Sequence, residues 1–323
     1  MRFMNLSPNA LIRGATVSAE AIPGLLPAHR VRAYAANESE SVQVGVPTSQ
    51  LDQATTTQSI MTCLKFATWN VNSLAVRLPQ VLDWLVAQAT TAPVDVLVLQ
   101  ETKLTDDKFP RAEIEAAGYQ VHWFGQKTYN GVALLSRTPV EDIARNIAGF
   151  DDEQARLIAG TVNGVRVIGG YFPNGKAPES DKFAYKMRWL TGLHNWVKAE
   201  LARHPRLVLM GDFNIAPEDR DAYDPVLLAG TIHLTPEERA HFQGLIGLGL
   251  VDAFRLFEQP AKAYSWWDYR MLAFRKNQGL RIDHILVSEA LRSKVTACTI
   301  DRLPRKNERP SDHAPVIVEL ARG

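Results

Sequence analysis

The sequence predicts an α/β protein, because short apolar runs alternate with helical periodicity from residue 64 onward. Strand-length apolar runs recur at 64–70, 94–99, 131–136, 166–171, 207–211, 282–287 and 314–320. Apolar residues at helical spacing cover 75–88, 182–203 and 236–248. With 323 residues, of which 46% are hydrophobic and 22% charged, the chain is long enough to bury a large core.

Each element has its own signal. The first run, LKFATWN, reads as a strand, and an amphipathic stretch at 75–88 follows it. VDVLVLQ and RLVLM are continuously apolar, which is typical of strands buried on both faces. Polar residues follow many of these strands, where the sheet fixes their position and the loop leaves them accessible.

Composition excludes several classes of protein. No run approaches 18 apolar residues, so we expect no transmembrane helix and no membrane partner. Two cysteines provide neither a disulfide framework nor a metal-binding spacing. We therefore expect a reduced, intracellular protein. A net charge of +1 does not announce a nucleic-acid binder, although the stretch 302–309 holds four basic side chains and one acid.

The first 60 residues differ from the rest. They contain no Lys, four Arg and four acids, and their Ser/Thr/Gln/Ala-rich composition does not support a packed core. We interpret residues 1–60 as a disordered extension. One explanation is a misassigned start codon, with Met61 as the true initiator. The other is a targeting segment, which would direct the protein to an organelle. Residues 61–323 then form one catalytic domain.

Six polar clusters stand at strand ends: WNVNS (69–73), LQETK (99–103), YFPNG (171–175), GDFN (211–214), RIDHI (281–285) and SDHAP (311–315). Each alone is more typical of a turn or a helix cap than of a ligand. Together they supply many oxygen donors, no Cys and few His: Asn70, Asn72, Glu101, Tyr171, Asn174, Asp212, Asn214, Asp283, Asp312 and His313. Such donors suit Mg²⁺, with Mn²⁺ as the alternative, rather than Zn²⁺. Metal, carboxylates and hydrogen-bond donors together indicate phosphoester hydrolysis.

The same motifs, in the same order, resemble the exonuclease III family of AP endonucleases. The wider group is the endonuclease/exonuclease/phosphatase superfamily, to which DNase I-like nucleases belong. The resemblance covers about residues 65–320. It implies a four-layer α/β sandwich, with two facing mixed sheets flanked by helices and a site where strand ends of both sheets converge.

The resemblance also implies catalytic roles. Tyr171 would contact the phosphate, and Asn214 would stabilise the transition state. Asp212 would activate water or protonate the leaving group. Asp283 would orient His313, so that the two form a dyad.

A metal site follows from the same resemblance. Glu101 would be the main carboxylate ligand, joined by Asn70 and Asp312 around one ion. With two ions, further side chains would lie near a metal, namely Asp212, Asn214 and His313.

DNA contacts are implied for other positions. Trp266 resembles the aromatic residue that helps form the pocket for a flipped abasic sugar, and Leu280 stands where some relatives carry tryptophan on the far pocket wall. Lys103, Arg156 and Asn174 would contact DNA. Further sequence-independent phosphate contacts are expected from Lys182, Arg302 and Lys306.

With the donor set, the resemblance thus implies a monomeric Mg²⁺-dependent DNA-repair enzyme that cuts double-stranded DNA 5′ to abasic sites. We expect it in the cytoplasm, as in bacteria, in association with the nucleoid. It would also remove 3′-blocking groups and act as a 3′→5′ exonuclease in base excision repair. Two alternatives stay open: a phosphomonoesterase or phospholipase of the same superfamily, and a catalytically inactive DNA-binding module. An apolar membrane-binding loop or a missing catalytic residue would favour these, and the sequence shows neither.

Overall fold

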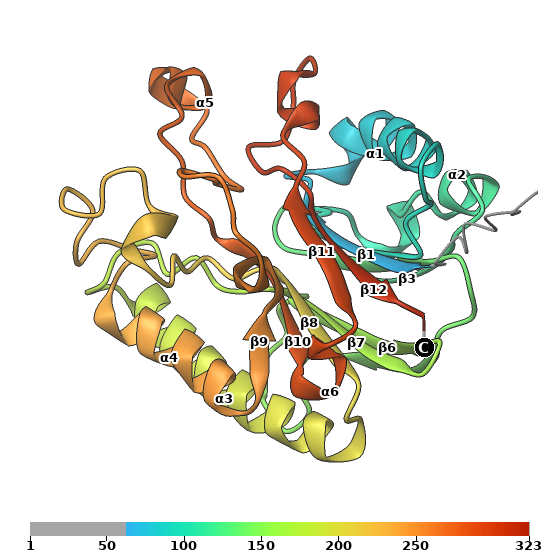
Figure 1. The fold of residues 1–323 in the computed structure, drawn as a ribbon, viewed down its shortest axis with the longest axis horizontal. Helices are drawn as coiled ribbons and strands as arrows, with labels where there is room; N and C mark the ends of the chain where they lie inside the picture. The colour runs from blue at the N-terminus through green and yellow to red at the C-terminus, as the bar shows by residue number, and fades with distance from the viewer. Residues whose placement is uncertain (1–62, 323) are drawn as a thin grey trace, which may run out of the picture. The chain divides into compact units, whose positions relative to one another are not determined.

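A computed structural model describes residues 63–322. Two six-stranded sheets form the centre of this part of the chain (Figure 1). The first sheet has the order β11 (Val295–Ile300), β12 (Val316–Ala321), β1 (Cys63–Asn70), β2 (Val96–Gln100), β4 (Val132–Ser136) and β3 (Gln120–Phe124). The second has the order β5 (Glu141–Arg145), β6 (Leu157–Val162), β7 (Val165–Tyr171), β8 (Leu207–Asp212), β10 (Asp283–Ser288) and β9 (Leu250–Asp252). The extension expected for residues 1–60 lies outside the described residues and stays a prediction.

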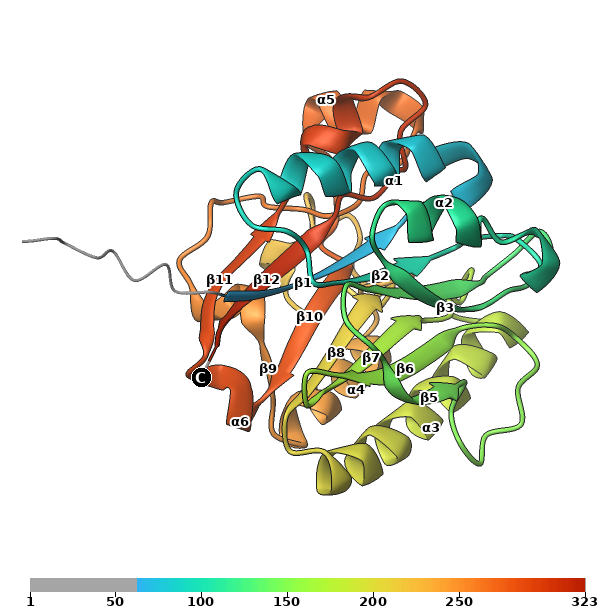
Figure 2. The ribbon, with the colours of Figure 1, turned by 90° about the vertical axis from the view of Figure 1, so that its right-hand side faces the viewer.

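Helices cover the outer faces of both sheets (Figure 2). The α-helices are α1 (Leu74–Ala89), α2 (Arg111–Ala116), α3 (Asp181–Arg203), α4 (Pro236–Gly247), α5 (Ala273–Lys276) and α6 (Glu289–Arg292). Helices α1 and α2 pack on the first sheet, and α3 and α4 on the second. The predicted four-layer α/β sandwich is therefore confirmed.

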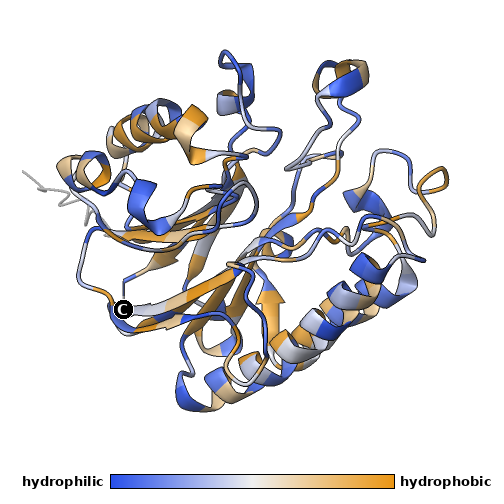
Figure 3. Cartoon of the chain, turned by 180° about the vertical axis from the view of Figure 1, so that it is seen from behind, coloured by the Kyte–Doolittle hydropathy of each residue, from blue (hydrophilic) through white to orange (hydrophobic). Residues whose placement is uncertain are grey.

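Strand alternation explains why the sheets face each other. Val96 and Val98 of β2 point into the core between the sheets, whereas Leu97 and Leu99 point toward α1 and α2. Successive side chains of a strand leave opposite faces, so a continuously apolar strand is buried on both sides. The hydrophobic colour accordingly concentrates in the strands (Figure 3).

Helix α4 begins at a capping box. Thr235 accepts a hydrogen bond from the Glu238 backbone N–H, and the Glu238 carboxylate accepts one from the Thr235 N–H. Pro236 occupies the first turn, where its missing N–H costs nothing. These signals fix where the helix begins and hold Glu238 against the second sheet.

All seven strands and three long helices predicted from the sequence are present, with boundaries shifted by one or two residues. The sequence analysis missed β3, β5, β6, β9 and β11. Four of these lie at sheet edges, where a long apolar run is not needed. Among the described residues, no helix is long and apolar enough to cross a membrane.

Candidate active site

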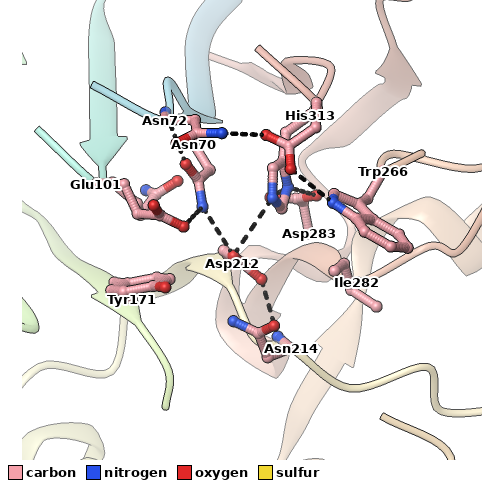
Figure 4. Close-up of polar contacts among 12 residues, drawn as sticks. Asn70, Asn72, Glu101, Tyr171, Asp212, Asn214, Trp266, Ile282, Asp283 and His313 are labelled. Carbon is pink, nitrogen blue, oxygen red and sulfur yellow. Dashed lines mark hydrogen bonds and ion pairs between the residues drawn. The ribbon is translucent and has the colours of Figure 1, made fainter. Parts of the chain in front are cut away.

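The candidate active site lies where the two sheets bring their strand ends together (Figure 4). Strands β7 and β8 are parallel, and β10 runs antiparallel to β8. Their register pairs Tyr171 with Asp212, and Asp212 with Asp283. From the first sheet, β1 ends at Asn70, and Glu101 directly follows β2. Strand register therefore aligns Tyr171, Asp212 and Asp283 in the second sheet, and the packing of the two sheets places Asn70 and Glu101 beside them.

His313 and Asp283 form a hydrogen-bonded dyad. His313 Nδ1 lies 2.8 Å from Asp283 Oδ2, and the Ser265 hydroxyl donates to that same oxygen at 2.7 Å. The other ring nitrogen, Nε2, lies 3.7 Å from Asp212 Oδ2. His313 is thus held between two buried carboxylates, with Nε2 toward Asp212 and the centre of the site.

The dyad shifts the protonation of both groups that face the site. Burial acts to lower the pKa of His313, but the charges of Asp283 and Asp212 outweigh it and raise the pKa. Burial raises the pKa of Asp212, and the negative charges of Asp283 and Glu101 raise it further. The charge of His313 and the hydrogen bond from Asn70 act to lower it. A proton is therefore available near Asp212 around neutral pH.

Asn70 ties the two sheets together at the site. Its Nδ2 donates to Glu101 Oε1 and to Asp212 Oδ2, both at 2.9 Å, while its Oδ1 accepts the backbone N–H of Asn72 at 3.0 Å. Asn70 thus presents its amide NH₂ to the carboxylates. Its predicted role as a metal ligand would require the amide to turn.

Lys103 points into the site. Its Nζ lies 2.8 Å from Glu101 Oε2 and 2.5 Å from Asn72 Oδ1. Asn72 Nδ2 in turn donates to Asp312 Oδ1 at 3.0 Å. Burial acts to raise the pKa of Asp312, but His313 and the hydrogen bonds lower it, so Asp312 stays ionised. The oxygens of Glu101 and Asn72 therefore already hold one cation, the lysine ammonium.

These donors fit a hard divalent ion. Glu101, Asn72 and Asp312 offer carboxylate and amide oxygens, the ligand type that Mg²⁺ and Mn²⁺ prefer. A second group, Asp212, Asp283 and His313, has ligand atoms within 4.8 Å of one another. In that group Asp283 and His313 Nδ1 are hydrogen-bonded to each other. The Asp212 carboxylate and His313 Nε2 are therefore the groups that remain to bind an ion.

Asn214 is held firmly beside Asp212. Its backbone N–H donates to Asp212 Oδ1 at 2.9 Å, and its Nδ2 donates to the Phe172 carbonyl at 3.1 Å. Asn174 Nδ2 donates to Asn214 Oδ1 at 3.1 Å. The predicted catalytic residues Tyr171, Asp212, Asn214, Asp283 and His313 therefore meet at one site, and Asn174 joins them there.

Tyr171 keeps its phenolic proton. Burial raises its pKa well above the ordinary value, and Glu101 and Asp212 add to this. Arg156 stacks over its ring, 5.1 Å from the centroid, and donates to the Tyr185 hydroxyl and to Gln154. Arg156 is buried against these tyrosines, so it supports Tyr171 from behind, and the structure does not present it as a freely solvated arginine.

The predicted pocket residues lie together. Trp266 and Leu280 pair across an antiparallel bridge and line a pocket of about 850 Å³. Trp266 Nε1 donates to Asp312 Oδ2 at 3.0 Å, which joins this pocket to the acidic site. The sequence analysis missed His233, a buried lining residue whose ring lies 6.4 Å from that of Trp266. Burial and Lys186 lower the pKa of His233 to about 4, so it is neutral at pH 7.

Ser265 and Lys186 were also missed as site residues. Ser265 directly precedes Trp266 and supports Asp283, which only the folded chain reveals. Lys186 lies on the helix predicted at 182–203 and is fully buried, with its ammonium 2.8 Å from the Asn214 carbonyl.

A family model describing the endonuclease/exonuclease/phosphatase family matches residues 67–313. The chain belongs to this family. The family is metal-dependent, and Asp212, Asp283 and His313 form a possible metal site. The matched residues include five of the six polar motifs in full and the sixth as far as His313.

Individual relatives place the chain more closely. It is 36% identical to exodeoxyribonuclease III from Haemophilus influenzae, over 80% of this chain and 100% of that protein. A 3′-5′ exonuclease from Neisseria meningitidis is 49% identical, with a TM-score of 0.77 over 80% of this chain and 100% of the other. An AP endonuclease from Archaeoglobus fulgidus is 34% identical, with a TM-score of 0.76 over 80% and 99%. The chain is therefore a nuclease of the exonuclease III type, and the resemblance predicted from its motifs is confirmed.

Proposed function

We propose that this nuclease is a Mg²⁺-dependent enzyme that hydrolyses double-stranded DNA 5′ to abasic sites and at blocked or free 3′ ends, acting as a monomer. The observation that carries the proposal is the convergence of Glu101, Asp212 and the Asp283–His313 dyad at one buried site. A pocket with a mostly apolar lining, which includes Trp266, lies next to this site. An abasic sugar has no base edge to recognise, so an apolar pocket of suitable shape suits it.

Hydrolysis joins a water oxygen to phosphorus and breaks the bond from phosphorus to the 3′ oxygen. The products are a 3′-hydroxyl and a 5′-phosphate. Asp212 takes the proton from the attacking water or delivers one to the departing 3′ oxygen, and its raised pKa suits either role. His313, held by Asp283, and the Asn214 amide place positive charge and hydrogen-bond donors where charge develops on the phosphate.

Tyr171 would contribute a neutral hydroxyl donor to the phosphate, because its pKa keeps the phenol protonated. Glu101 and Asp312 would hold the metal ion together with Asn72. The Asn72 side chain is hydrogen-bonded to both Asp312 and Lys103. When bound, Mg²⁺ would add positive charge beside the phosphate oxygens and lower the pKa of its bound water. Lys103 would then exchange its contact with Glu101 for the phosphate.

A second candidate is an enzyme specialised for 3′ ends. It is favoured by the 49% identity to a 3′-5′ exonuclease, compared with 34% to an AP endonuclease. The pocket supports the distinction, since Leu280 and the buried His233 line it beside Trp266. These two side chains set how much room remains for an abasic sugar.

One experiment separates these functions. A 5′-labelled duplex with a single tetrahydrofuran abasic site is incubated with the protein in Mg²⁺ and in EDTA, beside an undamaged duplex of the same sequence. A single Mg²⁺-dependent nick 5′ to the lesion supports the AP-endonuclease function. Shortening from the 3′ end alone identifies a 3′-end specialist. An intact strand, together with hydrolysis of inositol phosphates or sphingomyelin, would contradict both and favour another branch of the family.

A further inference from the structure

A fully buried ion pair lies behind the active site. Lys186 of α3 and Glu238 of α4 are both inaccessible to solvent, and Lys186 Nζ lies 2.5 Å from Glu238 Oε1. Removing two charges from water is costly, so such a pair is weak evidence for a gain in stability. Its contacts indicate another role.

The ammonium of Lys186 also contacts two loops of the active site. It donates to the Asn214 carbonyl at 2.8 Å and to the Asn174 carbonyl at 3.2 Å. With Glu238, these contacts use all three N–H donors of the ammonium. One side chain therefore joins the YFPNG loop, the GDFN loop and helix α4.

The contact with Lys186 also holds the Asn214 backbone. Its φ is +52°, in the left-handed region, which Asn adopts more readily than most residues other than glycine. The carbonyl of Asn214 accepts from Lys186 and also lies 2.7 Å from His233 Nδ1. The Asn214 N–H, in the preceding peptide unit, donates to Asp212, so the position of the Asn214 backbone also affects Asp212.

Glu238 fixes the lysine in turn. Its second oxygen, Oε2, accepts from the backbone N–H of Thr235 at 3.0 Å and from the Thr235 hydroxyl at 2.8 Å. The first turn of α4 therefore fixes the position of the carboxylate, and the carboxylate in turn fixes the position of the lysine ammonium. Every polar atom of the pair has a partner, which makes the network rigid.

We propose that Lys186 is a positioning residue for hydrolysis: it fixes the Asn174 and Asn214 peptides so that Asn214 and Asp212 face the phosphate, without touching DNA itself. The proposal rests on the proposed phosphodiester hydrolysis. A misplacement of about 1 Å in a catalytic group can lower a rate on the order of 100-fold. Loss of Lys186 should therefore act on turnover more than on binding.

The test replaces the pair together, Lys186→Met with Glu238→Gln, so that no buried charge is left unpaired. A matched control is Arg166→Met with Glu200→Gln. That pair is also buried, with a 2.7 Å contact, and Glu200 lies on the same helix, about 21 Å along α3 from Lys186. A third variant, Glu238→Gln alone, keeps the lysine contacts to both carbonyls.

We expect the Lys186→Met/Glu238→Gln protein to lose about 100-fold in kcat on DNA, with KM and the Kd for uncleaved DNA in EDTA changed less than threefold. The control pair should lower the thermal midpoint by a similar amount and leave kcat within threefold. Glu238→Gln alone should keep kcat within tenfold. If the Met variant does not fold, Lys186→Gln/Glu238→Gln replaces it with the same expectation.

Three results would overturn the proposal. One is an unchanged kcat in the folded Lys186 variant, and another is an equal loss of kcat in the Arg166/Glu200 control. The third is failure of both Lys186 variants to fold while the control folds, which would make the pair purely structural. An inactive wild-type protein would instead contradict the proposed function, so the two failures are distinguishable.

Discussion

Asp212 shows how burial prepares a single residue for proton transfer. It is the last residue of β8 and is almost fully buried, with Asn70 and the Asn214 N–H donating to it. Burial raises its pKa toward neutrality, while His313 opposes the shift. A carboxyl group that titrates near the working pH can both accept and deliver a proton.

Replacing Asp212 with Asn removes this proton carrier and changes the shape of the site little. We expect Asp212→Asn to lower kcat by about 10²–10⁴-fold, the usual contribution of general acid–base catalysis. Affinity for duplex DNA with a tetrahydrofuran site should stay within threefold, measured by fluorescence anisotropy in EDTA. Asp83→Asn, an exposed position on α1, serves as the control and should change neither quantity. Normal turnover by the Asp212 variant would refute its assigned role.

At the scale of elements, the Asp283–His313 dyad connects the two sheets. Asp283 begins β10 of the second sheet, whereas His313 lies in the loop before β12 of the first. Trp69 of β1 reaches the same loop through a hydrogen bond from Nε1 to the His313 carbonyl. The Asp283–His313 dyad is therefore also part of the contact between the layers.

This arrangement predicts a pH-dependent contribution to stability. The folded-state pKa of His313 is raised to about 10, so its stabilisation is fully present below pH 6.5 and is lost as the pH rises through the folded-state value. Asp283→Asn removes the charge that causes most of the increase. The wild type should thus exceed the variant in free energy of unfolding at pH 6.5, and this difference should shrink by at least about 1.4 kcal/mol toward pH 10.

Urea unfolding in EDTA at pH 6.5, 8 and 9.5 measures this difference. Asp83→Asn is again the control, because its exposed carboxylate should give the same difference from wild type at each pH. A constant gap between wild type and Asp283→Asn would show that Asp283 does not raise the pKa of His313.

At the scale of the whole molecule, loops around the site carry the basic side chains expected to meet phosphates. Lys306 is exposed at the end of a short 3₁₀ helix, Leu303–Lys306. Arg302 stacks over Trp267, 5.0 Å from the ring centroid, and Arg305 is buried. Among Arg302, Arg305 and Lys306, Lys306 is therefore the clearest candidate for a purely electrostatic contact.

We expect Lys306→Ala to weaken DNA binding uniformly across sequences. The slope of log Kd against log salt concentration should fall by about 1, the value for one lost phosphate contact. Lys294→Ala is the matched control, because Lys294 is exposed between α6 and β11. Helix α6 lies at the opposite end of the sheets from α5 (Figure 1). An unchanged slope for Lys306→Ala, or an equal change in the control, would exclude the contact.

The central strands and the polar residues at their ends could be predicted from the amino-acid sequence. The apolar run VLVL within VDVLVLQ indicates a buried strand, and a polar residue at the end of such a strand is held at the sheet edge. Asn70, Glu101 and Asp212 were predicted at the ends of strands and Asp283 at the beginning of one. Strand register and the packing of the two sheets bring them together. Edge strands such as β5 carry mostly exposed side chains, so their sequences gave no comparable signal.

The positions of the basic side chains could not be predicted from the sequence and are known from the folded structure. Lys103 turns inward to Glu101, Arg156 packs against tyrosines, and Lys186 is fully buried, although each could have been a solvated surface residue. The partner of Lys186, Glu238, stands 52 residues away in the sequence. Hydrophobic periodicity records which face of an element is buried, but the position of a long charged side chain depends on partners that only folding brings near.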